Sequence, residues 1–192
     1  MKLEYIYDTA LVMFRCQGIK ATKMEDVAAY LQISKRTLYE RFPSKDIFLL
    51  ACIKHEIEKE QEIIYLLEQK AISPLKQITK LYSHVIRFFQ SFHPSFFKDL
   101  RKFPECGKEL DNYILLVRKE INDLLHVSIA LGLCVKYCDT FLLSTFLIFR
   151  LEEIKNGIIC QPEKIKGVSN FVIKSMLLGY STEKGRKQLD AR

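Results

Sequence analysis

The sequence predicts an all-α protein. Apolar residues recur at intervals of three and four along most of the chain, which places them on one face of a helix. No segment shows the convincing apolar-polar alternation of a half-buried strand. The chain has only five prolines and seven glycines in 192 residues, and most of the prolines stand between the periodic stretches, where helices begin or end.

The first part of the chain contains three short periodic stretches. We expect helices over residues 3–17, from 22 or 23 to about 31, and over 35–41. Gly18 follows the first of them, at a position where a helix C-terminus favours glycine. Ser34 precedes the third and is a suitable N-cap, because its hydroxyl can accept a hydrogen bond from the first turn.

The remaining helices are separated by proline and serine signals. Ser44 caps a long fourth helix that connects the N-terminal unit to the rest of the chain, and the last residues, 181–192, have the composition of a frayed polar tail. We divide the chain into an N-terminal domain over 1–46 and a helical domain over 47–192. The expected later helices cover residues 45–70, 74–92, 95–102, 105–131, 139–156 and 162–180.

Composition excludes several classes of protein. With 48% hydrophobic and 28% charged residues, the chain fits neither a disordered nor a fibrous protein. The apolar stretch 141–149 is far shorter than the roughly 20 residues that a bilayer requires. The N-terminus lacks the layout of a secretory signal, so we expect a cytoplasmic protein without a membrane partner. The six cysteines form no CxxC pair, and we expect neither a metal nor a cofactor.

Basic residues are concentrated within the N-terminal domain. The chain has a net charge of +7, but the first 50 residues hold eight basic and six acidic residues, so the total charge says little. Between Lys35 and Lys45 there are four basic residues and one acid. This is the segment where we expect a phosphate backbone to be met.

The third expected helix has one apolar and one polar face. Leu38 must face inward, and at about 100° per residue Arg36 and Glu40 point nearly opposite, with Thr37 and Tyr39 at the sides. Such a face offers the donors, hydroxyls and cations that a helix needs in the major groove of DNA. A solvated surface helix would have a similar pattern, so spacing alone leaves both interpretations open.

Residues 3–48 resemble the DNA-binding region of the tetracycline-repressor (TetR) family. Three positions depart from that pattern: Gln32 stands where a turn glycine is frequent, Lys23 where a capping threonine is frequent, and Arg36 where a glycine is common. The matching residues are Gly18, Ala21-Thr22, Val27-Ala28, Ile33-Ser34-Lys35, Thr37-Leu38-Tyr39, Phe42 and Ser44-Lys45.

The resemblance implies a repressor that binds a palindromic, double-stranded operator as a homodimer. Arg36 could bond bidentately to guanine or remain solvated or bound to a phosphate, and both interpretations stay open. By the resemblance, the recognition surface consists of Lys35, Arg36, Thr37 and Tyr39, Lys45 meets a phosphate, and Lys23 and Arg41 are further candidates.

The same resemblance implies a small-molecule effector bound in the C-terminal bundle. Dimerisation is expected through the last two helices, because residues 141–149 are apolar all round and one monomer cannot bury every side of them. Aromatic residues are numerous enough to line an apolar cavity, and the candidate lining is Tyr82, Phe89, Tyr113, Phe141 and Thr145.

Two functions other than repression are also compatible with parts of this sequence. A transcriptional activator shares every DNA contact with a repressor and differs only in where the operator lies, so the sequence is compatible with both. A helical small-molecule-binding protein without DNA binding is a second alternative, and the basic cluster from Lys35 to Lys45 argues against it. The four histidines are isolated from any acid and nucleophile in a recognisable order, so we expect no enzyme.

Overall fold

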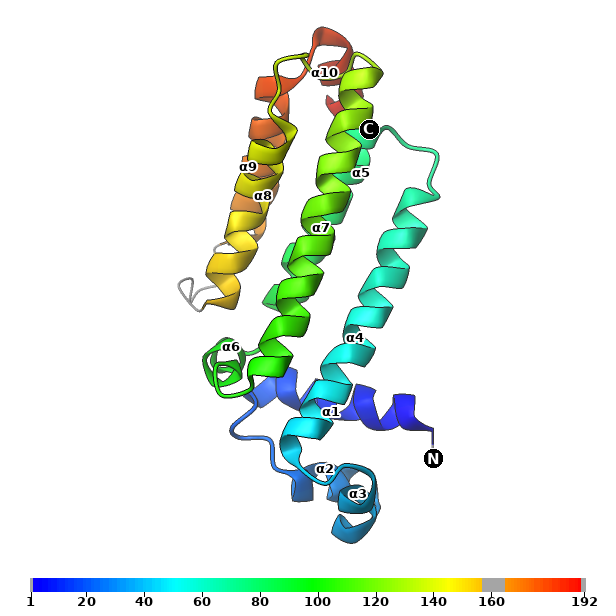
Figure 1. Ribbon diagram of the computed structural model, residues 1–192, viewed down its shortest axis with the longest axis vertical. Coiled ribbons are helices and arrows are strands. Elements are labelled where there is room, and N and C mark those ends of the chain that lie inside the picture. Colours follow the sequence, from blue (N-terminus) through cyan, green and yellow to red (C-terminus); the bar gives the residue numbers. More distant parts are fainter. Residues whose placement is uncertain (1, 157–164, 191–192) are drawn as a thin grey trace. The chain divides into compact units, whose positions relative to one another are not determined.

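The computed structural model describes residues 2–156 and 165–190, with the side chains of 165–170 excepted. This part of the chain is all-α, as the sequence predicts, and holds no strand beyond an isolated antiparallel bridge between Cys134 and Ser181 (Figure 1). The helices are α1 (Leu3–Gln17), α2 (Met24–Tyr30), α3 (Lys35–Arg41), α4 (Lys45–Glu68), α5 (Pro74–Gln90), α6 (Pro94–Leu100), α7 (Pro104–Ala130), α8 (Thr140–Lys155), α9 (Ile165–Tyr180) and α10 (Glu183–Asp190).

The capping signals explain where the early helices begin. The Ser34 hydroxyl accepts a hydrogen bond of 3.0 Å from the Thr37 backbone N–H at the start of α3. The Ser44 hydroxyl accepts one of 3.2 Å from the Ile47 backbone N–H at the start of α4. Helix α9 is described from Ile165, so the start expected at 162 lies outside the described residues.

The prediction of a frayed C-terminal tail is wrong. Residues 183–190 form helix α10, whose Gly185 is buried so closely against Leu133 that an added Cβ would come within 2.1 Å of the Leu133 carbonyl oxygen. The Thr182 backbone N–H donates a bond of 2.9 Å to the same carbonyl, and its hydroxyl donates one of 2.7 Å to the Gly132 carbonyl. This polar segment packs against the loop that follows α7, which composition does not reveal.

The chain forms two compact units. The first contains residues 1–62 and 91–113, and the second contains 63–90 and 114–192, so α4 and α7 each contribute to both. The expected domain boundary after residue 46 falls at the start of α4 and stays a prediction. In the part of the chain that the structure describes, no helix is long and apolar enough to cross a membrane.

In the first unit, α6 packs against the end of α1. The His93 backbone N–H donates to the Arg15 carbonyl at 2.8 Å, and the Lys20 backbone N–H donates to Asp99 Oδ2 at 2.8 Å. Gly18 has a φ of +85°, and a Cβ there would come 2.2 Å from the Ser95 hydroxyl. Glycine is therefore required at this position both by the backbone conformation and by the contact with α6.

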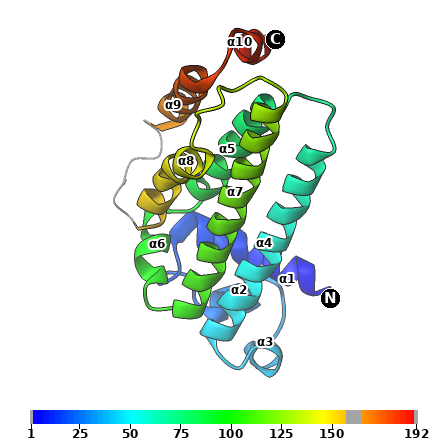
Figure 2. The same cartoon turned by 45° about the horizontal axis from the view of Figure 1, so that its top comes forward.

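In the second unit, α5 is the central helix and contacts α8, α9 and α10 (Figure 2). Its apolar face is fully buried and includes Ile78, Val85 and Phe89. Buried residues of the surrounding helices complete this core and include Leu147 on α8 and Leu177 on α9. The apolar spacing read from the sequence therefore corresponds to buried helix faces.

Candidate functional site

Helices α2 and α3 pack together through a tight turn. The Ile33 backbone N–H donates to the Ala28 carbonyl at 3.0 Å and closes the turn. Gln32 has a φ of +56°, which among the described residues is the only positive φ outside glycine. Val27 and Leu38 are fully buried on the two helices. The positive φ explains why glycine would suit position 32, and the apolar contact sets the angle at which α3 is presented.

The outward face of α3 carries Arg36. Its side chain is 85% exposed, and Nε donates to Glu40 Oε1 at 2.8 Å, one helical turn away. The two groups lie opposite the buried Leu38, as the spacing predicts. Because only Nε is bound to Glu40, the terminal nitrogens of Arg36 remain available to an acceptor.

Lys35 is held by two partners in the same domain. Its ammonium lies 2.5 Å from Glu25 Oε1 on α2 and 5.5 Å from the centre of the Tyr39 ring. The hydrogen bond from Lys35 lowers the pKa of Glu25, and the same bond raises the pKa of Lys35. Lys35 is thus a charged group on the surface whose position is set by α2 as well as by α3.

The other predicted residues of the recognition surface differ in their solvent exposure and in their hydrogen bonds. Thr37 is half-buried, and its hydroxyl lies 2.8 Å from the Ser34 hydroxyl within the cap of α3. Lys23, at the N-cap of α2, and Arg41, in the last turn of α3, are both exposed. The structure therefore gives Thr37 a contact in the helix cap and leaves two cations at the edges of this face.

Lys45 is directed into the domain. Its ammonium donates to the backbone carbonyls of Ile19 at 2.5 Å and Thr22 at 2.6 Å, in the loop between α1 and α2. Burial lowers the pKa of Lys45. The residue fastens the start of α4 to this loop, and the phosphate contact expected for it stays a prediction.

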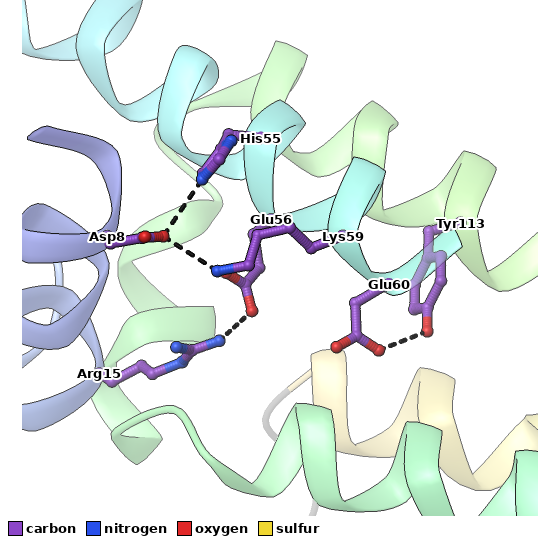
Figure 3. A network of polar contacts seen from close by, with 7 residues as sticks. All are labelled: Asp8, Arg15, His55, Glu56, Lys59, Glu60 and Tyr113. Atoms are coloured by element: carbon purple, nitrogen blue, oxygen red, sulfur yellow. Dashed lines mark hydrogen bonds and ion pairs between the residues drawn. The ribbon is translucent and has the colours of Figure 1, made fainter. Parts of the chain in front are cut away.

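A network of charged side chains joins α4 to α1 in the first unit (Figure 3). Asp8 Oδ1 accepts a bond of 2.9 Å from Lys59 and lies 3.1 Å from His55 Nε2. Burial would raise the pKa of Asp8, but the bonds from Lys59 and His55 outweigh it and hold that pKa below its usual value. Arg15 donates to Glu56, whose side chain is only 7% exposed.

A separate polar contact joins α4 to α7 in the same unit. The buried Tyr113 hydroxyl donates to Glu60 Oε2 at 3.0 Å, as Figure 3 shows, and burial together with the Glu60 carboxylate raises the pKa of Tyr113. Lys54 lies 3.3 Å from Glu109 on the same pair of helices. A shift of α4 against α1 or α7 would therefore separate buried charges from their partners, which is costly.

The five residues predicted to line an effector cavity have different surroundings. Tyr113 belongs to the first unit and bonds to Glu60, whereas the other four belong to the second. Phe89 is fully buried, Phe141 is 62% exposed, and Thr145 bonds to a backbone carbonyl on α8. Tyr82 does line a cavity of about 310 Å³ between α5, α8 and α9.

The comparisons with known proteins agree on the N-terminal region. Residues 6–52 match the family model described as "Bacterial regulatory proteins, tetR family". The match contains α2, the turn at Gln32 and α3. This N-terminal region belongs to the TetR family. The resemblance seen in the sequence is thereby confirmed.

A curated relative of this chain is named as a transcriptional regulator. A segment of 89 residues is 33% identical to the uncharacterized HTH-type transcriptional regulator YuxN of Bacillus subtilis (strain 168), and it covers 44% of this chain and 31% of that protein. The aligned segment thus spans about a third of the length of this curated relative.

Solved structures of similar fold cover nearly the whole chain. A transcriptional regulator from Cytophaga hutchinsonii has a TM-score of 0.77 at 19% identity, over 94% of this chain and 98% of that one. A TetR/AcrR-family regulator from Thermobifida fusca has a TM-score of 0.68 at 21% identity, over 93% and 97% of the two chains. At this identity the likeness shows the fold, an N-terminal helix-turn-helix followed by further helices.

Sequence reasoning on this TetR-family domain missed the acidic partners of its cations. The pairing of Arg36 with Glu40 could have been found, because residues four apart on a helix are neighbours. The pairing of Lys35 with Glu25 could not, because it depends on how α2 and α3 pack. The buried pair of Arg15 and Glu56 is separated by 41 residues and has no local signal.

Proposed function

We propose that the protein is a transcriptional repressor that binds a palindromic operator as a dimer through α3. The observation that carries the proposal is the polar face of that helix, where the exposed Arg36 stands opposite the buried Leu38. An arginine at such a position can bond to the O6 and N7 atoms of guanine in the major groove. Lys35, Thr37 and Tyr39 complete the recognition surface, and Lys23 and Arg41 are candidates for phosphate contacts.

The dimer part of the proposal is supported by exposed apolar side chains on α8 and α9. Phe141 and Leu142 on α8 are 62% and 48% exposed, and Phe171 on α9 is 72% exposed. An apolar face of this kind is typical of an interface. Two copies packed about a twofold axis would present two copies of α3 to successive major grooves, about 34–36 Å apart.

The dimer is tested by light scattering at micromolar concentration. We expect a dimer for the wild type and a monomer for Phe171→Glu, because a carboxylate in the interface would lose its hydration. Tyr65→Glu is the matched control, since Tyr65 is 59% exposed on α4 and outside the proposed interface. A monomeric wild type would refute this part of the proposal.

The response to a small-molecule effector is the third part of the proposal. An effector in the helical bundle would change the separation of the two copies of α3 in the dimer, and α4 can transmit the change because it contributes to both units. A 100-fold loss of operator affinity requires about 2.7 kcal/mol of coupling, and operator must weaken effector binding equally. Calorimetry with and without operator measures this; equal effector affinity in both conditions would exclude it.

Operator binding is tested by selecting bound fragments from genomic DNA, including the region upstream of the protein's own gene. On a selected fragment, Arg36→Ala should cost about 1–3 kcal/mol of binding free energy. Lys136→Ala is the control, because it removes one positive charge from an exposed site in the second unit. If the two variants bind equally well, α3 is not the recognition helix. Reporter transcription from the same fragment then separates repression from activation.

A further inference from the structure

The cavity in the second unit has a polar cluster on an otherwise apolar wall. It lies between α5, α8 and α9 and has a volume of about 310 Å³, at the lower end of the range of about 300–1,000 Å³ for small-molecule sites. Five apolar side chains, Phe146, Leu147, Phe149, Val172 and Met176, form most of its lining. The other described residues of the lining are Tyr82, Arg150 and Glu153.

Tyr82 is the first sign that the cavity takes a ligand. The residue is only 2% exposed, and among the described residues its hydroxyl forms no hydrogen bond. Burial raises the pKa of Tyr82 to about 12, with Arg150 opposing the rise and Glu153 adding to it, so the phenol is neutral at ordinary pH. A neutral phenol can both donate and accept a hydrogen bond, so a polar group on an occupant of the cavity can bond to it.

Arg150 and Glu153 decide which head group fits. Arg150 Nη1 lies 3.0 Å from Glu153 Oε2, and the two side chains are 38% and 22% exposed. The pair is neutral overall. A carboxylate bound to Arg150 would lie beside the charge of Glu153, and an ammonium bound to Glu153 would lie beside that of Arg150. A neutral group that both accepts and donates a hydrogen bond meets neither repulsion.

We propose that this cavity binds an uncharged amphipathic molecule, with an apolar body against the phenylalanines and a neutral hydroxyl or amide head at Tyr82, Arg150 and Glu153. The proposal names the chemical class of effector, and to that extent it rests on the proposed function. Binding itself does not require DNA, so the test below uses the full chain without DNA. Failure of operator binding and failure of this proposal are thereby separate results.

The probe is N-phenyl-1-naphthylamine, an uncharged apolar dye whose emission is not overlapped by tryptophan, because the chain has none. The competitors are 1-decanol, decanamide, decanoate and decylammonium, which share one chain and differ in the head. We expect the wild type to bind the dye and release it to decanol or decanamide at concentrations about tenfold lower than to either ion. No dye binding, as when a second copy of the chain fills the cavity, would overturn the proposal.

Variants that remove one charge of the Arg150–Glu153 pair separate recognition of the head group from the greater apolarity of the alcohol. In Glu153→Gln the charge of Arg150 is no longer balanced, so decanoate should compete about tenfold better than in the wild type. Arg150→Gln should favour decylammonium in the same way. Glu152→Gln is the matched control, because Glu152 is the exposed neighbour on α8 and does not line the cavity. If Glu153→Gln and Glu152→Gln bind decanoate alike, the head does not lie at this pair.

Discussion

The ammonium of Lys45 lies 2.6 Å from the backbone carbonyl oxygen of Thr22 and donates a hydrogen bond to it. A second bond, of 2.5 Å, goes to the Ile19 carbonyl. The two carbonyls belong to the loop that leads from α1 to α2, and Lys45 is the first residue of α4. A single charged side chain thus joins the helix-turn-helix to the long helix that follows it.

We predict that Lys45→Met lowers the free energy of unfolding by about 2–3 kcal/mol, because two carbonyls lose a charged donor in a partly buried site. Urea unfolding monitored by circular dichroism measures the change. Lys98→Met is the control, since Lys98 is exposed on α6 and carries the same charge. Unchanged stability of Lys45→Met combined with weaker DNA binding would instead favour the phosphate contact expected from the sequence.

The Glu40 carboxylate accepts a bond of 2.8 Å from the Arg36 guanidinium, so in the proposed operator complex it would compete with DNA for that group. We predict that Glu40→Gln raises operator affinity about twofold or more. The substitution releases Arg36 from an exposed ion pair, which contributes little free energy, and removes a negative charge near phosphate. Gel-shift titration at fixed salt measures the affinity. Glu62→Gln, on the exposed side of α4, controls for net charge. A loss of affinity in Glu40→Gln would mean that Glu40 itself contacts the operator.

The φ of +56° at Gln32, in the turn between α2 and α3, is unfavourable for a residue that has a Cβ. We predict that Gln32→Gly raises the free energy of unfolding by about 0.5–1 kcal/mol, because glycine reaches this conformation without strain from a Cβ. The opposite sign is expected for Gln61→Gly, which should lower it by about 1 kcal/mol at an exposed site within α4. Urea unfolding of both variants gives the comparison. Destabilisation by both would show that position 32 carries no strain.

Glu120 makes stability depend on pH in the second unit. Burial, followed by a hydrogen bond with Glu68, raises the pKa of Glu120 from 4.5 to about 6. Between these values the native state holds more protons than the unfolded state, so this group's contribution to stability falls as the pH rises from below 4.5 to above 6.

We predict that Glu120→Gln removes this contribution to the decrease in stability with rising pH, because an amide does not titrate in this range. Urea midpoints at intervals from pH 4 to pH 7 test it, with the difference between wild type and variant growing across about pH 4.5–6. Glu152→Gln, an exposed carboxyl on α8, should run parallel to the wild type. Parallel curves for Glu120→Gln as well would contradict the raised pKa.

Local signals in the sequence account for the helices and for the outward face of α3. A helix is specified by residues within one or two turns of each other, so the apolar spacing and the serines at positions 34 and 44 were sufficient to predict where α3 and α4 begin. The same short range explains why Leu38 could be predicted to face inward and Arg36 outward.

Contacts between residues far apart in the chain depend on how the helices pack, and no local pattern encodes them. Lys45 reads as an exposed cation, but the loop between α1 and α2 supplies two carbonyls 23 and 26 residues away. Residues 183–190 read as a polar tail, but Leu133 offers a backbone carbonyl against which Gly185 and Thr182 pack. The cluster of Tyr82, Arg150 and Glu153 likewise exists because α5 and α8 lie together. Burial at this place raises the pKa of Tyr82 above its value in water.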